Sequence, residues 1–264
     1  MSDRARVFEF DNAIVRKPAP SIVNGLRADD RGSPAYDKVI AEHEAYVAAL
    51  RKAGVEVQVL DADDAYPDSM FVEDPALVFG EGAILLRPGA PSRLGESDKI
   101  RATLKARFPQ CLEMPATGFA EGGDILTTPR AVMIGLSART DAGGAAAVMA
   151  CLKKLGRKSQ VVRTPPGVLH FKTDCSLLDE ATVLTTARLA ASGVFADFKT
   201  LLVPEGEEAA ANALRVNRSV FVGAKFPRTI ELLASRGYDV IALDTEEIGM
   251  VDAGLSCMSL RWHS

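Results

Sequence analysis

One pattern recurs along the chain and limits its fold more than any other feature. It consists of a short apolar strand, a polar turn, a second strand, a helical stretch and a third strand. The strand–turn–strand hairpins are expected at 76–86, 124–135, 175–184 and 213–222. Their reversals are marked by the turn residues Gly80, Pro129, Asp179 and Asn217. The repeat spacing is roughly 40 to 55 residues, slightly longer than in many repeat families.

Helical stretches lead into further short apolar strands. These strands are expected at 55–60, 111–114, 159–162, 201–203 and 240–243. In the first helix, Ser33 and Pro34 suit the N-cap and the first helical position, and Gly54 ends the helix. The predicted buried face of this helix carries Tyr36, Ile40, His43, Val47 and Leu50.

A fifth hairpin is split between the two ends of the sequence. Its halves are 256–261 and 13–16, and their pairing would close a ring without an unpaired sheet edge. The sequence therefore predicts an α/β fold of five strand–strand–helix–strand (ββαβ) repeats with fivefold pseudosymmetry. We expect a single domain over residues 1–264, closed by pairing of the N-terminal and C-terminal strands.

Charge and hydropathy exclude several classes of partner. The chain has 31 Lys plus Arg against 35 Asp plus Glu, a formal net charge of −4, so it lacks the basic field that attracts nucleic acid. The first ten residues carry charges where a secretion signal needs an apolar core. No apolar run approaches the roughly 18 residues of a membrane span. We expect a cytoplasmic protein with no nucleic-acid or membrane partner.

Metals and cofactors have no support in the sequence. The four cysteines, Cys111, Cys151, Cys175 and Cys257, stand far apart and form no CxxC pair, so neither a zinc site nor a disulfide framework is indicated. No glycine-rich phosphate loop precedes a helix. We expect no metal and no cofactor, and we expect Cys111, Cys151 and Cys175 to lie in the core.

The repeat also predicts where chemically active side chains meet. Residues that enter the first strand of each hairpin would converge on the axis of the ring. These positions hold Glu73 and Asp74, Glu121, His170 with Lys172, Asn212, and Cys257. A cysteine near a histidine makes a nucleophile with an acid/base partner, and carboxylates suit a cationic substrate.

Each of these residues also has a simpler interpretation. A free cysteine is most often a small buried hydrophobic residue. An acidic pair such as Glu73 and Asp74 is usually a solvated loop, and Arg93 and Arg139 are compatible with surface cations.

Seven segments occur in one order along nearly the whole chain. They are SIVNGLR (21–27), FVED (71–74), RPGAPSR (87–93), EGGD (121–124), GLSART (135–140), LHFK (169–172) and GLSC (254–257). Together they resemble the dimethylarginine dimethylaminohydrolase family of the bacterial type. That family is similar to the wider guanidino-group-modifying (pentein) superfamily, whose five-bladed α/β propeller agrees with the five repeats.

The resemblance implies roles for ten residues. The catalytic ones are Cys257 as nucleophile, His170 as general acid and base, and Glu121, which hydrogen-bonds the guanidinium or orients the histidine. The substrate-binding ones are Leu26, Asp68, Phe71, Glu73, Asp74, Arg93 and Arg139.

Within the substrate-binding set, Asp74 would pair with guanidinium nitrogens, with Glu73 and Asp68 supporting that end of the site. Arg93 and Arg139 would clamp an α-carboxylate, because a planar guanidinium matches a carboxylate bidentately. Leu26 would cover the pocket.

The implied reaction converts Nω-methylated arginines (asymmetric dimethylarginine or monomethylarginine) to citrulline and dimethylamine or methylamine. A guanidinium carbon is stabilised by resonance, so its hydrolysis at neutral pH needs a stronger nucleophile than water. A Cys257 thiolate would attack it and form an S-alkylthiouronium intermediate. His170 would first protonate the departing amine and then activate water.

Two other functions stay open. The first is another guanidino or ureido hydrolase of the superfamily, such as arginine deiminase or citrulline hydrolase, and the second is a non-catalytic binding propeller. Cys257 with His170 argues against the binding propeller. Lys172 argues against arginine deiminase, because deiminases of the superfamily typically have an Asp at this place. The expected partner is a small-molecule substrate, and the oligomeric state is open, with a homodimer as one candidate.

Overall fold

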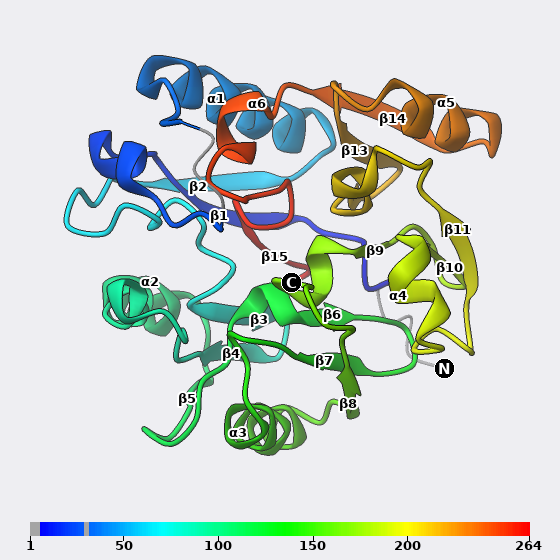
Figure 1. Cartoon of the computed structure of the whole chain (residues 1–264). Helices are drawn as coiled ribbons and strands as arrows, with labels where there is room; N and C mark the ends of the chain where they lie inside the picture. Colours follow the sequence, from blue (N-terminus) through cyan, green and yellow to red (C-terminus); the bar gives the residue numbers. More distant parts are fainter. Residues whose placement is uncertain (1–5, 29–31) are drawn as a thin grey trace.

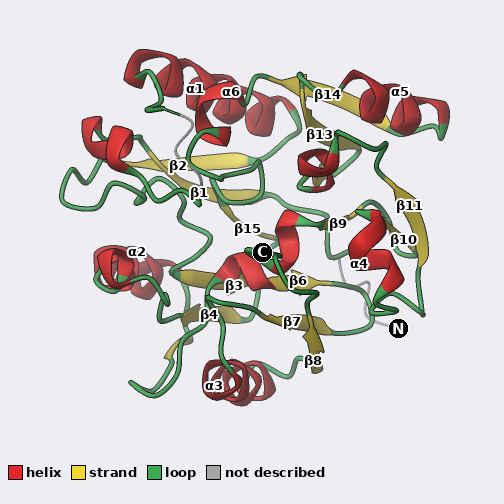
Figure 2. Ribbon diagram, viewed as in Figure 1, coloured by secondary structure: helices red, strands yellow, loops and turns green. Residues whose placement is uncertain are grey.

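Five three-stranded sheets are arranged around a common centre (Figure 1). The computed structural model describes residues 6–28 and 32–264. Each sheet carries a helix on the outer side of the ring (Figure 2). The predicted α/β propeller of five repeats is therefore confirmed.

The blade formed by β3, β4 and β5 shows how each repeat is built. β3 (Ala76–Phe79) pairs antiparallel with β4 (Gly82–Leu85), and β4 pairs parallel with β5 (Cys111–Glu113). A parallel pair needs a crossover connection. The helix α2 (Glu96–Arg107) provides that crossover on the outside of the ring.

The other four blades repeat this order from the centre outward. The third blade holds β6 (Ile125–Thr127), β7 (Val132–Leu136), α3 (Ala142–Lys154) and β8 (Ser159–Arg163). The fourth holds β9 (Cys175–Leu177), β10 (Thr182–Thr185), α4 (Ala187–Ala191) and β11 (Lys199–Leu202). The fifth holds β12 (Leu214–Val216), β13 (Ser219–Gly223), α5 (Pro227–Ser235) and β14 (Asp239–Leu243). The short helix α6 (Glu246–Gly249) follows.

The first blade joins segments from both ends of the described chain. β1 (Asn12–Arg16) pairs parallel with β2 (Glu56–Leu60) across helix α1 (Tyr36–Lys52). On its other edge, β1 pairs antiparallel with β15 (Leu260–Trp262), with Ala13 opposite Arg261. This pairing joins the two halves of the split hairpin.

Burial decreases from the middle of each blade to its outer edge. All residues of β4 are buried, whereas the outer strand β8 leaves Val161 41% exposed. The apolar residues pack in clusters between neighbouring blades; one cluster joins Ile84 of β4 with Ile134 of β7 and Leu152 of α3. Each sheet therefore buries its faces against its own helix and the next blade.

The start of α1 differs from the prediction. The helix begins at Tyr36 with Ala35 as N-cap, two residues later than Ser33 and Pro34 imply. The Ala35 N–H donates to Glu247 Oε2 at 2.7 Å, so a side chain from α6 fixes the first turn. The helix ends as predicted, because Gly54 directly follows its C-cap with a φ of +90°.

No helix within residues 6–28 and 32–264 is both long and apolar enough to cross a bilayer.

Candidate active site

Short 3-10 helices place the axial side chains at equivalent points of the ring. Glu121 is the N-cap of η3 (Gly122–Asp124), which leads into β6. His170 is the N-cap of η4 (Phe171–Thr173), which precedes β9. Because the loops repeat in neighbouring blades, their side chains meet near the centre, as the repeat predicts.

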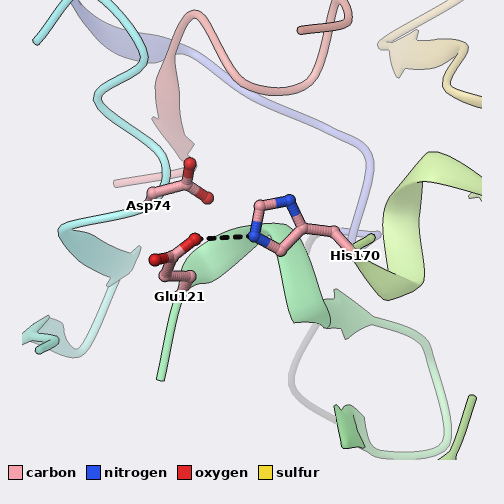
Figure 3. Close-up of side chains that lie close together, drawn as sticks. All are labelled: Asp74, Glu121 and His170. Atoms are coloured by element: carbon pink, nitrogen blue, oxygen red, sulfur yellow. Dashed lines mark hydrogen bonds and ion pairs between the residues drawn. The ribbon is translucent and has the colours of Figure 1, made fainter. Parts of the chain in front are cut away.

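Glu121, His170 and Asp74 lie together at this point (Figure 3). His170 Nε2 is 2.6 Å from Glu121 Oε2, and Glu121 is fully buried. The other oxygen of Glu121 accepts from the Gly89 N–H at 2.8 Å and from Arg139 at 3.3 Å. Both carboxylate oxygens therefore have fixed partners, and the imidazole is held in one orientation.

Gly123 allows this close packing. Its N–H donates to Asp74 Oδ1 at 2.9 Å. A Cβ atom at this position would lie 2.8 Å from His170 Cγ and 3.0 Å from Asp74 Oδ1. Only a glycine therefore leaves both side chains where they are.

The carboxylates determine the charge of the imidazole. Burial disfavours a charged His170, but Asp74 and the hydrogen bond to Glu121 outweigh it and raise the pKa to about 9. Burial also disfavours a charged Glu121, yet the bond to His170 lowers the pKa of that carboxyl. The pKa of Asp74 is likewise lowered, because Arg93 and His170 outweigh its burial.

Cys257 lies on a turn that immediately precedes the innermost strand of the first blade. Its N–H donates to the Gly254 carbonyl at 3.2 Å, and its own carbonyl accepts from the Glu73 N–H at 3.2 Å. Burial, Glu73 and Asp74 raise the pKa of the thiol to about 12. The free site therefore holds the protonated thiol at neutral pH.

A cavity of about 130 Å³ brings most of the predicted site residues together. Eight of the ten line it: Leu26, Asp68, Phe71, Asp74, Arg93, Arg139, His170 and Cys257. Glu121 does not line the cavity but contacts His170, which does. Sequence reasoning missed the far wall, which Val251, Asp252 and Ala253 supply just before the GLSC segment.

Glu73 does not line this cavity. Its carboxylate binds Lys172 Nζ at 2.5 Å, Arg261 at 3.1 Å and the Ser256 hydroxyl at 3.0 Å. Glu73 and Asp74 are both buried, so the solvated-loop interpretation is wrong. Lys172 is paired with Glu73 and does not line this cavity either.

Arg93 is also not a surface cation, because it is 4% exposed. It binds Asp74 Oδ2 at 2.5 Å and Glu96 Oε2 at 2.7 Å. Burial raises the pKa of Glu96 to about 7 even beside this guanidinium. Glu96 was missed by sequence reasoning; its spacing of three residues from Arg93 was the available signal.

The segment around Leu26 covers one side of the cavity. The Leu26 N–H donates to Asp68 Oδ1 at 3.1 Å, and the Ala28 N–H donates to Asp252 Oδ2 at 2.5 Å. Burial raises the pKa of Asp68. Two backbone bonds therefore hold this segment against the residues that line the pocket.

Comparison with known proteins identifies the family. The chain is 42% identical over 254 residues to the N(G),N(G)-dimethylarginine dimethylaminohydrolase of Pseudomonas aeruginosa, covering 96% of this chain and 100% of the relative. The chain belongs to the dimethylarginine dimethylaminohydrolase family. A model of the eukaryotic N,N dimethylarginine dimethylhydrolase family also matches residues 25–158.

Other members and folds agree with this assignment. The dimethylarginine dimethylaminohydrolase of Streptomyces coelicolor is 31% identical over 252 residues, which is 94% of this chain and 96% of the relative. A crystal structure of the Pseudomonas aeruginosa enzyme, a Cys-to-Ser mutant complexed with citrulline, is 41% identical. It superposes with a TM-score of 0.93 over 96% of this chain and all of that chain. A cyanobacterial arginine dihydrolase domain shares the fold at 19% identity.

The spacing of Asp74, Glu121 and His170 resembles that of a metal site, because one ligand atom of each lies within 4.8 Å of the others. In this family member, however, Glu121 binds His170 and Asp74 binds Arg93. These protein cations already balance the carboxylates. The expectation that no metal is needed stays a prediction.

The remaining cysteines lie away from the site. Cys151 and Cys175 are buried in apolar clusters, as predicted for core residues. Cys111 is only partly buried and packs against the cluster beneath α2. Burial raises the pKa of all three thiols, which makes them weak nucleophiles.

Proposed function

We propose that the protein hydrolyses asymmetric dimethylarginine and monomethylarginine to citrulline and dimethylamine or methylamine. One observation carries the proposal: Cys257, His170 and Asp74 line a single cavity in a member of the dimethylarginine dimethylaminohydrolase family. The substrate is a small molecule, and the described blades act together as one domain around this cavity.

Substrate binding would prepare the nucleophile. The guanidinium enters beside Asp74, where its positive charge offsets the carboxylates that raise the thiol pKa. The thiol then loses its proton to water. The thiolate of Cys257 adds to the guanidinium carbon and forms a neutral tetrahedral adduct.

His170 would carry both proton transfers. With its raised pKa it is protonated at neutral pH, so it can give a proton to the methylated nitrogen. The C–N bond breaks, the amine leaves, and an S-alkylthiouronium remains on Cys257. Neutral His170 then takes a proton from water, and the hydroxide adds to the same carbon. The C–S bond breaks, the hydroxyl proton passes to the departing sulfur, and citrulline leaves with the Cys257 thiol restored.

Arg93 and Arg139 have different roles in substrate binding. Arg93 is bonded to Asp74 and Glu96, so it holds the guanidinium-binding carboxylate in place. Arg139 is 20% exposed at its side chain and has a single ion-pair partner in Glu121 among the described residues. We assign the α-carboxylate of the substrate mainly to Arg139.

Lys172 supports a preference for methylated substrates. Deiminases of the superfamily typically have an Asp at this sequence position, and here the Lys172 ammonium is paired with Glu73 instead. One nitrogen of the guanidinium therefore lacks an acidic partner and can carry methyl groups. An unsubstituted nitrogen there would lose water without gaining full partners, at a cost of roughly 1 to 3 kcal/mol.

The test is direct. Pure protein is incubated separately with asymmetric dimethylarginine, monomethylarginine, arginine, agmatine and citrulline, and the released amine is identified. Dimethylamine and methylamine from the first two substrates are the expected products. Faster ammonia release from arginine or citrulline would assign the protein to another branch of the superfamily. Cytoplasmic localisation and a homodimer stay predictions.

A further inference from the structure

Asn212 occupies the axial position of the fifth blade, and the reaction above gives it no role. It is the C-cap of η5 (Glu208–Ala211) and precedes β12, in the segment that leads into the first strand of its blade. The residue is half-buried. It lines a second cavity, of about 240 Å³, together with His170 and Cys257.

The Asn212 amide bridges two loops from different blades. Its Nδ2 donates to the Lys172 carbonyl at 3.0 Å, and its Oδ1 accepts from the Ser256 N–H at 3.1 Å. Because a carbonyl needs a donor and an N–H needs an acceptor, the orientation of the amide is fixed. Lys172 is two residues after His170, and Ser256 directly precedes Cys257. The planar Asn212 amide thus links the segment that carries His170 to the turn that carries Cys257.

Gly254 shows how closely the nucleophile turn lies against this amide. A Cβ atom at Gly254 would lie 2.5 Å from Asn212 Oδ1 and 2.9 Å from Nδ2. The Gly254 carbonyl in turn accepts from the Cys257 N–H at 3.2 Å and closes the turn. Asn212 therefore contacts the nucleophile turn at Gly254 and again at Ser256.

We propose that Asn212 is a positioning residue that holds the Cys257 turn at a fixed distance from His170. The kinetic part of this inference rests on the proposed function. Ser256 and Lys172 are both buried. Loss of the amide leaves their backbone N–H and C=O without partners, so the turn shifts to find new ones. A displacement of about 1 Å at the reacting atoms can cost on the order of 100-fold in rate.

The first test replaces the amide by a side chain of similar size. Asn212→Leu removes both hydrogen bonds, and we expect kcat to fall about 10- to 100-fold while KM changes less than about threefold. Activity is measured where circular dichroism shows the variant to be folded. A wild-type kcat in this folded variant would overturn the proposal.

A second variant makes the bridge pH-dependent. In Asn212→Asp, the ionised carboxylate can accept from Ser256 but cannot donate to the Lys172 carbonyl, whereas the protonated acid can do both. We expect the ratio of variant to wild-type kcat to rise as the pH falls. A ratio that stays constant with pH argues against the bridge, and this variant also covers the case in which Asn212→Leu does not fold.

A readout without substrate separates this inference from the proposed function. Cys257 is alkylated with iodoacetamide at pH 8 and the modified peptide is quantified by mass spectrometry. Release of the turn exposes the thiol, so alkylation should be several-fold faster in Asn212→Leu than in the wild type. If the wild type fails to hydrolyse methylarginines but alkylation is faster in the variant, only the proposed function fails. Unchanged alkylation defeats the positioning role.

Asn217 provides a matched control at the other end of the same strand. Its side chain also bridges distant segments, bonding Phe10 N at 2.8 Å and Ala53 O at 2.8 Å. It has a φ of 54°, so Asn217→Gly removes the bridge without backbone strain. We expect this variant to lose stability but to keep kcat and the alkylation rate within about twofold of wild type. If Asn212→Leu and Asn217→Gly lose kcat equally, Asn212 contributes only to stability.

Discussion

His170 Nε2 lies 2.6 Å from Glu121 Oε2, and Glu121 has no exposed surface. The Glu121 side chain is itself held in place, because the Gly89 N–H donates to its other carboxylate oxygen. The imidazole can therefore change its protonation state without changing its position. Proton transfer at this site depends on the charges around the pair.

Stability should depend on pH through His170. Its pKa in the folded protein, about 9, lies above its ordinary value of 6.5. The stabilisation is therefore fully present below about pH 6.5 and is lost as the pH rises through about 9. Urea unfolding of wild type and His170→Gln at pH 6 and pH 10 checks this. We expect the wild type's advantage at pH 6 to shrink at pH 10, and a constant difference contradicts the assigned charge state.

Substitution at Gly123 should displace the imidazole. In Gly123→Ala the new Cβ would meet His170 Cγ at 2.8 Å, so we expect kcat to fall at least about tenfold. The matched control is Gly143→Ala on α3, where the nearest atom to a new Cβ is the Asp141 side chain at 3.3 Å. This control should keep full activity. Equal kcat values for the two variants would show that the site tolerates the shift.

Removal of the nucleophile should stop turnover without unfolding the protein. Cys257→Ser should have no measurable activity, and rapid acid quench of the wild type should trap an adduct on Cys257. Cys151→Ala, in the core, should keep its activity and lose about 1 to 2 kcal/mol of unfolding free energy. Substantial activity in Cys257→Ser would remove this thiol from the mechanism.

Asp74→Asn should separate thiol reactivity from catalysis. The substitution removes a charge that raises the thiol pKa, so alkylation of Cys257 should shift to lower pH. At the same time kcat/KM for dimethylarginine should fall about 100-fold, because the guanidinium loses its charged partner. Asp197→Asn, at a side chain that is 75% exposed, is the control and should change neither. If the alkylation rate of Cys257 and kcat/KM for dimethylarginine rise together or fall together in Asp74→Asn, the two roles of Asp74 are contradicted.

Arg139→Ala should affect substrates that carry an α-carboxylate. We expect kcat/KM for dimethylarginine to fall about 10- to 100-fold, with agmatine, which lacks that group, much less affected. Arg130→Ala, at a largely exposed arginine on the β6–β7 turn, should leave both values unchanged. An equal loss for agmatine would place Arg139 at the guanidinium end.

The repeated pattern explains why so much of the fold was predictable. Apolar residues recur at every second position in the strands of a hairpin and about every 3.6 positions in a helix, and glycine or proline marks the change between them. Each blade can therefore be recognised from its own stretch of sequence. Because the repeat is regular, it also placed Glu121, His170 and Cys257 at equivalent positions. The seven matching segments contain the other predicted pocket residues except Asp68, which lies three positions before FVED.

Details that depend on distant side chains were not predictable. Arg93 also binds Asp74, which lies 19 positions earlier in the chain, and no local pattern reports that contact. Glu73 faces away from its neighbour Asp74 because Lys172 and Arg261 meet it from other blades. The N-cap of α1 is likewise set by Glu247, more than 200 positions further along the chain.

The pairing of β1 with β15 has a consequence for biosynthesis. During translation the four continuous hairpins, β3–β4, β6–β7, β9–β10 and β12–β13, are synthesised before the segment with Cys257. Until β15 arrives, β1 offers an open edge to any other extended chain, and the acidic pocket lacks its thiol. With Cys257 as the proposed nucleophile, the nascent protein is inert toward substrate and prone to aggregation at the same stage, and docking of one short strand ends both conditions.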